Sequence, residues 1–236
     1  MIITIDGPVA TGKSGVAKKL AESIGYIFFD TGAMYRTLTY GILKDKIDIK
    51  QPDQLQQFLD QFPSKFDIKI VQRERRYYFE GEEVTQHIRG QEVTSAVSEV
   101  SASKAVRDKL IALQRELAVG VNAVFEGRDM GTVVFPDATL KIFLTGRDDI
   151  RSKRRFDELK TKYSQDSQNL TLEQCLIDIN KRDTIDSTRE NSPLIQAKDA
   201  YVIDTSDLTM DEVVFRILEC MDSLKTKPHS PNRSSS

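Results

Sequence analysis

Residues 2–14 read IITIDGPVATGKS, which joins a short apolar run to a loop of the pattern G-x-x-x-x-G-K-[ST]. The loop begins at Gly7 and closes at Lys13 and Ser14, and apolar residues at helical spacing follow from Val16. This order of strand, glycine-bearing loop and helix is the context in which the pattern binds phosphate groups. Average composition would produce the four fixed positions by chance in only roughly one chain in a hundred of this length. We therefore interpret the loop as a P-loop, which predicts binding of a nucleoside triphosphate.

Each fixed position of this loop has a chemical task. Gly7 and Gly12 permit backbone angles that let successive N–H groups point at phosphate oxygens. The helix that follows adds the positive end of its dipole. Lys13 is expected to place its charge on the β- and γ-phosphates, and the hydroxyl of Ser14 is expected to bind Mg²⁺. The predicted ATP-phosphate site comprises Gly7, Pro8, Val9, Ala10, Thr11, Gly12, Lys13, Ser14 and Gly15.

Five short apolar runs predict the central sheet. Runs of this length, rich in β-branched and aromatic residues, are typical of parallel strands that are buried on both faces. Helical patterns lie between them, over residues 16–24, 106–117 and 211–224, so the chain alternates strand and helix. We expect an α/β fold of the P-loop NTPase type, with a five-stranded parallel sheet flanked by helices. The expected strands are residues 2–6, 26–29, 122–126, 140–144 and 201–204.

Two segments depart from this alternation. Between residues 62 and 88, short runs of alternating polarity and a following Gly81 predict a small antiparallel β insert. Residues 226–236 are rich in Ser and Pro and have no apolar face, so we expect disorder there. Residues 1–225 are expected to form a single domain.

Composition argues against several other classes of protein. The 236 residues include 34 Lys or Arg and 36 Asp or Glu, and the net charge of −2 is unlike that of a general nucleic-acid or membrane-surface binder. No window approaches the about 18 apolar residues that span a bilayer. The two cysteines and two histidines match no metal-ligand spacing. We expect a soluble, cytoplasmic monomer with no nucleic-acid or membrane partner.

Three further clusters bear on the group that receives the phosphate. Residues 30–36, which are expected to form a loop, and residues 126–129 follow the second and third expected strands, and ligands of open α/β sheets bind beyond the carboxyl ends of strands. The third cluster is the mixed-charge segment 182–189, preceded by four arginines. Phosphoryl transfer needs such a positive clamp on charged oxygens. Each cluster alone also has an ordinary structural explanation, and Arg151 and Arg155 fit a solvated helix face equally well.

Together these motifs resemble the bacterial cytidylate kinases, which are nucleoside monophosphate kinases of the P-loop class. The resemblance runs in order from about residue 2 to residue 204 and therefore covers nearly the whole chain. The small β insert also resembles the extension that marks the bacterial branch of the family. The matching segments are residues 5–8, 30–36, 127–138 and 141–144, and the segment that holds Arg182, Asp183, Asp186 and Arg189.

The resemblance implies a role for each matched side chain of the acceptor site. Without it, Ser98 would be an ordinary helix-face serine, Arg107 a surface charge and Tyr35 a core aromatic. The family pattern assigns the 5′-phosphate clamp to Arg36, Arg128 and Arg189, the sugar to Thr31, Tyr35 and Asp186, and the cytosine edge to Ser98, Arg107 and Asp129. A carboxylate, a hydroxyl and a guanidinium suit cytosine, which has an amino donor beside two acceptors.

The resemblance also implies the catalytic groups and the moving parts. Lys13, Arg128, Arg182 and Arg189 are expected to stabilise the transferred phosphoryl group, and Arg154 is a further candidate. Residues 31–107, insert included, would form the acceptor-binding region, and residues 147–189 a helical lid.

Two positions depart from the family pattern. Glu126 stands where Asp is common, which puts its contact with Mg²⁺ in question because the carboxylate is one bond length farther out. Gly15 stands where Thr often follows the serine, and this removes a hydroxyl from the phosphate side.

The sequence therefore predicts an ATP-dependent kinase of pyrimidine nucleotide metabolism that converts CMP or dCMP to CDP or dCDP with Mg²⁺. Two alternatives remain at this point. One is a kinase for another small acceptor, such as UMP or shikimate. The other is a P-loop switch protein that binds nucleotide without transferring phosphate, although the guanine-binding N-K-x-D sequence of GTPases is absent.

Overall fold

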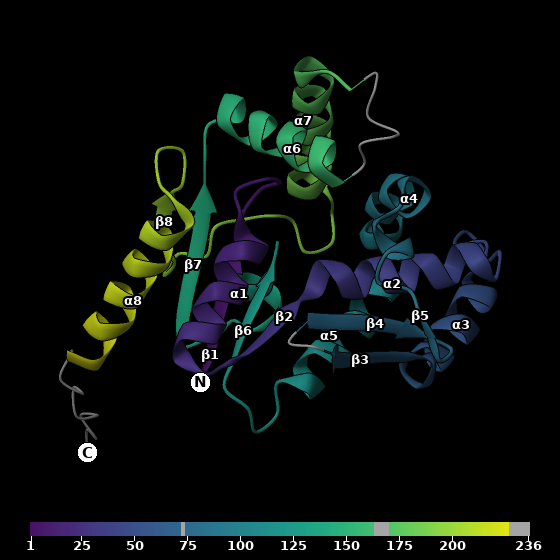
Figure 1. Ribbon diagram of the computed structural model, residues 1–236. Helices are drawn as coiled ribbons and strands as arrows, with labels where there is room; N and C mark the ends of the chain where they lie inside the picture. The colour runs from purple at the N-terminus through teal and green to yellow at the C-terminus, as the bar shows by residue number, and fades with distance from the viewer. Residues whose placement is uncertain (72–73, 163–169, 227–236) are drawn as a thin grey trace.

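A five-stranded parallel sheet forms the centre of the computed structural model, which describes residues 1–71, 74–162 and 170–226 (Figure 1). The strand order is β2-β6-β1-β7-β8, with the P-loop strand in the middle. All five predicted strands are confirmed, and their ends differ from the prediction by at most one residue. They are β1 (Ile2–Asp6), β2 (Ile27–Asp30), β6 (Ala123–Gly127), β7 (Leu140–Thr145) and β8 (Tyr201–Asp204).

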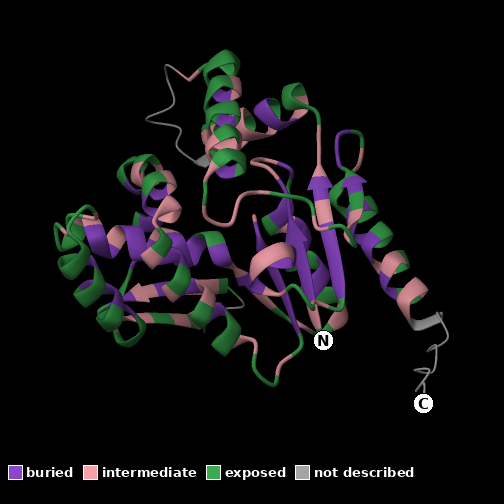
Figure 2. Ribbon diagram, turned by 180° about the vertical axis from the view of Figure 1, so that it is seen from behind, coloured by how far each residue is buried: buried purple, intermediate pink, exposed green. Residues whose placement is uncertain are grey.

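Helices cover both faces of this sheet, which explains why its strands are apolar at nearly every position. On one face, α1 (Lys13–Ile24) and α8 (Met210–Thr226) pack against Ile3, Ile5 and Leu144 in one apolar core. On the other face, α5 (Lys104–Leu117) covers a second core in which the Phe29 and Phe125 rings stack 4.5 Å apart. Figure 2 shows the central strands as almost wholly buried.

A separate core lies beside the sheet, under the predicted insert. Its three antiparallel strands, β3 (Phe66–Val71), β4 (Glu74–Phe79) and β5 (Glu82–Glu83), confirm the expected β structure, whereas residues 62–65 belong to the preceding helix. Buried aromatic and aliphatic side chains, such as Phe62 and Phe79, join these strands to the helices around them. Those helices are α2 (Thr31–Lys44), α3 (Pro52–Lys65), the 3₁₀ turn η1 (His87–Arg89), α4 (Gln91–Ala102) and, through Val106 and Leu110, α5.

The segment after β2 is a helix, where the sequence was interpreted as a loop. Helix α2 begins at Thr31, directly after the strand. Asp30 caps it, because its carboxylate accepts a hydrogen bond from Ala33 N–H at 2.8 Å. Tyr35 and Arg36 therefore occupy the first two turns of a helix that starts at the carboxyl end of the sheet.

Two further helices lie beyond that same end of the sheet. They are α6 (Asp148–Lys162) and α7 (Leu172–Thr188), and Figure 1 shows both above the arrowhead of β7. They pack against each other and correspond to the helical segment predicted over residues 147–189. The predicted disorder of the tail concerns residues outside the described part of the chain, apart from Thr226, which ends α8. Among the described helices, none has the length and apolar character needed to cross a bilayer.

Asp6 links the P-loop strand to the loop after β6. Its buried carboxylate accepts hydrogen bonds from Met130 N–H at 2.9 Å and from Gly131 N–H at 2.7 Å. These two residues begin η2 (Met130–Val134), a single turn of π-helix of the kind that is frequent at functional sites. Burial raises the pKa of Asp6 to about 6, although the two N–H donors oppose that shift.

This raised pKa predicts a pH dependence of stability. The folded state binds the Asp6 proton more tightly than the unfolded state, whose pKa is near 3.8, so the contribution is largest below pH 4 and is lost as the pH rises to about 6. The difference between the pKa of Asp6 in the folded state and in the unfolded state corresponds to about 3 kcal/mol in the free energy of unfolding. We expect urea unfolding between pH 4 and 7 to show a flatter pH dependence for Asp6→Asn than for the wild type. Parallel curves would contradict this expectation.

Candidate active site

The P-loop adopts the backbone that its glycines were expected to provide. Gly7 has φ of 147° and Gly12 has φ of 89°, and both values lie in the region that L side chains rarely adopt. A Cβ on Gly7 would also lie 2.1 Å from the carbonyl oxygen of Leu144. Ala10, at the tip of the loop, has φ of 60° although it carries a side chain. The loop is thus curled as a phosphate cradle, directly between β1 and α1.

Lys13 is folded back into its own loop. Its Nζ donates to the Pro8 carbonyl at 2.5 Å and lies 3.4 Å from Thr11 Oγ1. Burial lowers the pKa of Lys13, and the nearby Arg128 guanidinium lowers it further. An anion in the cradle would reverse this effect, since phosphate oxygens would stabilise the ammonium form.

Ser14 and Glu126 form the group that best fits Mg²⁺. Ser14 Oγ donates to Glu126 Oε1 at 2.6 Å, so the longer side chain of Glu126 does reach the serine. Burial raises the pKa of Glu126, with a further contribution from the Asp30 carboxylate. A hydroxyl and a carboxylate are the hard oxygen ligands that Mg²⁺ uses beside phosphates and water. The departure from Asp at this position therefore leaves a suitable donor pair.

Asp129 lies beside other residues of the predicted acceptor site. It is 2% exposed and pairs with Arg107, which is equally buried. The Arg189 guanidinium lies 3.6 Å from the other carboxylate oxygen. Arg107 also lies over the Tyr35 ring, 5.3 Å from its centre. The structure thus brings four of the predicted acceptor residues together, although they are contributed by four separate segments.

A second charged group adjoins the first one. Arg128 Nε donates to Asp186 at 2.8 Å, and Arg189 lies 3.7 Å from the same carboxylate. Burial alone would raise the pKa of Asp186, but Arg128 and Arg182 hold it below its usual value. Arg36 Nη1 donates to Thr94 Oγ1 and to the Ile88 carbonyl. Three predicted phosphate-clamp arginines and one predicted sugar ligand therefore occupy this part of the site.

Several buried polar atoms around these groups make no hydrogen bond with the described part of the chain. They belong to side chains that were predicted to contact the acceptor nucleotide or the transferred phosphoryl group. Buried polar groups in native proteins normally have partners, so unpaired ones that gather at one place point to a ligand. The atoms are Tyr35 Oη, Arg107 Nε, Arg182 Nε and Arg189 Nη2.

Other predicted residues have less direct positions. The Thr31 hydroxyl donates to the Glu126 carbonyl at 2.7 Å, which ties the start of α2 to the end of β6. Ser98 is half-buried on α4, one turn before Ser101, whose carbonyl accepts from Arg107. Arg154 donates to Thr205 after β8, and Arg155 pairs with Glu158 on its own helix.

Two residues that the sequence named without assigning them a role also belong to this site, Arg151 and Asp183. Arg151 is 5% exposed, so the solvated helix face is the wrong interpretation for this residue. It pairs with Asp183, which also accepts a hydrogen bond from the P-loop at Val9 N–H. Both residues lie in segments where charges of both signs alternate, and that pattern usually indicates an exposed helix.

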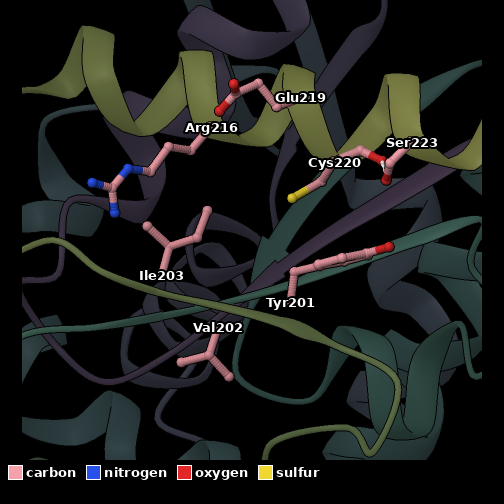
Figure 3. Close-up of a pocket in the computed structure, with 7 residues that line it drawn as sticks. All are labelled: Tyr201, Val202, Ile203, Arg216, Glu219, Cys220 and Ser223. Atoms are coloured by element: carbon pink, nitrogen blue, oxygen red, sulfur yellow. Dashed lines mark hydrogen bonds between the residues drawn. The ribbon is translucent and has the colours of Figure 1, made fainter.

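A hollow at the edge of the sheet lies apart from these groups. It has a volume of about 380 Å³ between β8 and α8 and is lined by Tyr201, Ile203 and Cys220, among others (Figure 3). The residues that line it include none from the P-loop and none of the arginines of the predicted acceptor site.

The fold and the P-loop are those of a P-loop kinase, an enzyme that holds a nucleoside triphosphate in that loop. Comparison with known proteins narrows this class. Residues 3–223 match the family model for cytidylate kinase. The chain therefore belongs to the cytidylate kinase family.

Individual relatives agree with this assignment. A cytidylate kinase from Protochlamydia amoebophila is 68% identical, and the match covers 96% of this chain and 99% of that relative. A cytidylate kinase from Enterococcus faecalis is 44% identical over 91% of this chain and 92% of that relative. Among solved structures, an uncharacterized protein from Eubacterium ventriosum matches with a TM-score of 0.51 at 15% identity, over 94% of this chain and 99% of that one, which supports the fold alone.

Proposed function

We propose that this chain transfers the γ-phosphoryl group of ATP to CMP or dCMP, with Mg²⁺, and so forms ADP with CDP or dCDP. Membership of the family favours this acceptor over shikimate and favours a kinase over a switch protein. The observation that carries the proposal is the group of charged side chains around Asp129 and Asp186, in which several buried polar atoms have no hydrogen-bond partner among the described residues. A cytosine nucleotide offers complementary donors and acceptors for such a set.

On the donor side, residues 7–15 would hold the ATP phosphates. Lys13 would move from the Pro8 carbonyl to the β- and γ-phosphates, because a phosphate oxygen satisfies its charge better than a peptide oxygen. Ser14 and Glu126 would hold Mg²⁺, directly or through water. When bound, Mg²⁺ neutralises part of the charge on the β- and γ-phosphates.

On the acceptor side, three groups of residues divide the nucleotide between them. Their neighbourhood supports this division, since Asp186 bridges Arg128 and Arg189 and Asp129 lies beside Arg189. Arg36, Arg128 and Arg189 would clamp the 5′-phosphate, Thr31, Tyr35 and Asp186 would hold the sugar, and Ser98, Arg107 and Asp129 would read the cytosine edge.

The transfer needs no protein nucleophile. An oxygen of the acceptor phosphate attacks the γ-phosphorus in line, and the protein supplies position and positive charge. Lys13, Arg128, Arg182 and Arg189 would stabilise the group in flight. Helices α6 and α7 would form the lid that was predicted for residues 147–189. The closed lid would exclude water, which would otherwise receive the phosphoryl group.

We further propose the organisation that the sequence suggested. Residues 1–225 would act as one domain, with residues 31–107 as the acceptor-binding region. The enzyme would work as a monomer in the cytoplasm, where its nucleotide substrates are held, without nucleic acid. The near-zero net charge supports the last point.

The test of the function is ADP formation from Mg-ATP in the presence of CMP, dCMP, UMP or AMP, each added separately. We expect fast turnover with CMP and dCMP, slow turnover with UMP and none above the ATP-only rate with AMP. UMP lacks the amino donor, so it would leave Asp129 poorly paired. If none of the four acceptors supports turnover although the protein binds ATP measurably, the proposed function is rejected.

A further inference from the structure

The tip of the P-loop is held by α6 and α7. Val9 N–H donates to Asp183 Oδ1 on α7 at 2.9 Å, and the Val9 carbonyl accepts from Arg151 Nη1 on α6 at 2.9 Å. Asp183 Oδ2 and Arg151 Nη1 are themselves 2.5 Å apart. Both backbone polar groups of one loop residue are therefore bonded to the two helices, in a closed set of three hydrogen bonds.

This contact is well placed to shape the loop. Arg151 is buried, and its Nη2 is also bonded to Asp148 at 2.6 Å, so the guanidinium is fixed from two sides. Val9 directly precedes Ala10, whose φ of 60° is unfavourable for a residue with a side chain. Such a conformation persists only where its surroundings hold it. The bonds to Val9 supply that support next to the strained residue.

The same helix also reaches the acceptor side. Arg182, Asp186 and Arg189 are spaced at i, i+4 and i+7 and therefore share one side of α7 and its end. Asp186 on this side pairs with Arg128 at 2.8 Å. Asp183 is one residue beyond Arg182, so α7 touches the donor loop with one residue and the acceptor arginines with its neighbours.

We propose that Asp183, together with Arg151, is a positioning residue that fixes α7 to the P-loop and thereby sets Arg182 relative to the ATP phosphates. The inference rests on the proposed function of the P-loop and of Arg182. Asp183 itself is bonded to the loop backbone and to Arg151, and it touches no reacting atom. Its loss releases α7 from the loop tip, while Asp186 keeps its pair with Arg128 and Asp129 keeps its pair with Arg107.

The test compares Asp183→Asn and Asp183→Ala with the wild type in kcat, KM for ATP and direct binding of CMP by calorimetry. We expect kcat to fall about 100-fold in Asp183→Ala, since a misplacement of about 1 Å can have that effect. Asp183→Asn should fall less, because its amide oxygen still accepts from Val9 N–H. The Kd for CMP alone should stay within about threefold, as measured on protein whose circular dichroism matches the wild type.

Two controls make the outcome decisive. Asp178→Asn, an exposed acid bonded to Gln174 on the same helix, should leave kcat unchanged. Asp183→Ala should also reduce kcat by a much smaller factor in an Arg151→Ala background than in the wild type, since the two residues act on Val9 as one unit. Additive effects, or equal losses of kcat and CMP affinity, would overturn the inference. An inactive wild type would instead reject the proposed function. If Asp183→Ala does not fold, the result for Asp183→Asn, which keeps the shape of the side chain, tests the inference.

Discussion

Arg182→Gln should reduce kcat about 1000-fold without making the ligand-free protein less stable. An arginine that stabilises the transferred phosphoryl group contributes about 10³-fold or more to kcat. Arg182 is poised for that task, because its Nε is buried without a hydrogen-bond partner in the described residues. The proposed transition state supplies the missing acceptor oxygens.

The stability expectation has the opposite sign from that of most substitutions at buried arginines. Burial lowers the pKa of Arg182 to about 10, and the Arg128, Arg36 and Arg155 guanidiniums around it contribute to that shift. Glutamine removes this repulsion and keeps part of the side chain. We therefore expect the urea midpoint to stay equal or to rise, while turnover is almost lost.

Lys181→Gln is the matched control. It removes the same charge from the neighbouring residue of α7, whose side chain is exposed. Its kcat should remain within about twofold of the wild type. If the urea midpoint of Arg182→Gln falls along with its kcat, Arg182 supports the fold and is not poised for the reaction.

The features that could be predicted from sequence are those set by neighbouring residues. The P-loop and the β insert are local patterns, and each parallel strand is an apolar run that ends at a turn or charge. The start of α2 is also locally encoded, because Asp30 caps it through Ala33 N–H, although the segment was expected to form a loop.

The remaining features depend on partners that are distant in the sequence. Arg107 has the surroundings of a surface charge on its own helix, and the carboxylate that pairs with it, Asp129, follows 22 residues later. Arg151 and Asp183 are 32 residues apart and meet only because α6 and α7 pack together. The π turn η2 likewise depends on the carboxylate of Asp6, which lies 124 residues before Met130.

Asp129→Asn should lower kcat/KM for CMP about 100- to 1000-fold and leave kcat/KM for UMP nearly unchanged. The carboxylate accepts from the N4 amino group of cytosine in the proposed complex, and a site built for such a donor rejects analogues that lack it. An asparagine side chain also carries an amide N–H₂, which can donate to the O4 atom of uracil. The ratio of kcat/KM for CMP to kcat/KM for UMP should therefore fall by about the same factor.

This substitution should also weaken the fold. Asp129 is the only carboxylate that pairs with the buried Arg107 among the described residues, and it lies 3.6 Å from Arg189. Removing one partner of a buried ion pair typically costs about 3–5 kcal/mol, because the other charge stays buried. Activity should therefore be measured at a temperature where circular dichroism shows the variant to be folded.

Asp137→Asn provides the comparison, since it makes the same chemical change at an exposed position farther along the same loop. It should alter neither the stability nor the ratio of CMP to UMP turnover. The decisive quantity is that ratio in Asp129→Asn. If CMP and UMP lose activity equally, Asp129 acts by holding Arg107 and Arg189 in place. If the ratio collapses while turnover with UMP persists, its carboxylate reads the amino group of the base, because a general disturbance of the pocket would affect both acceptors.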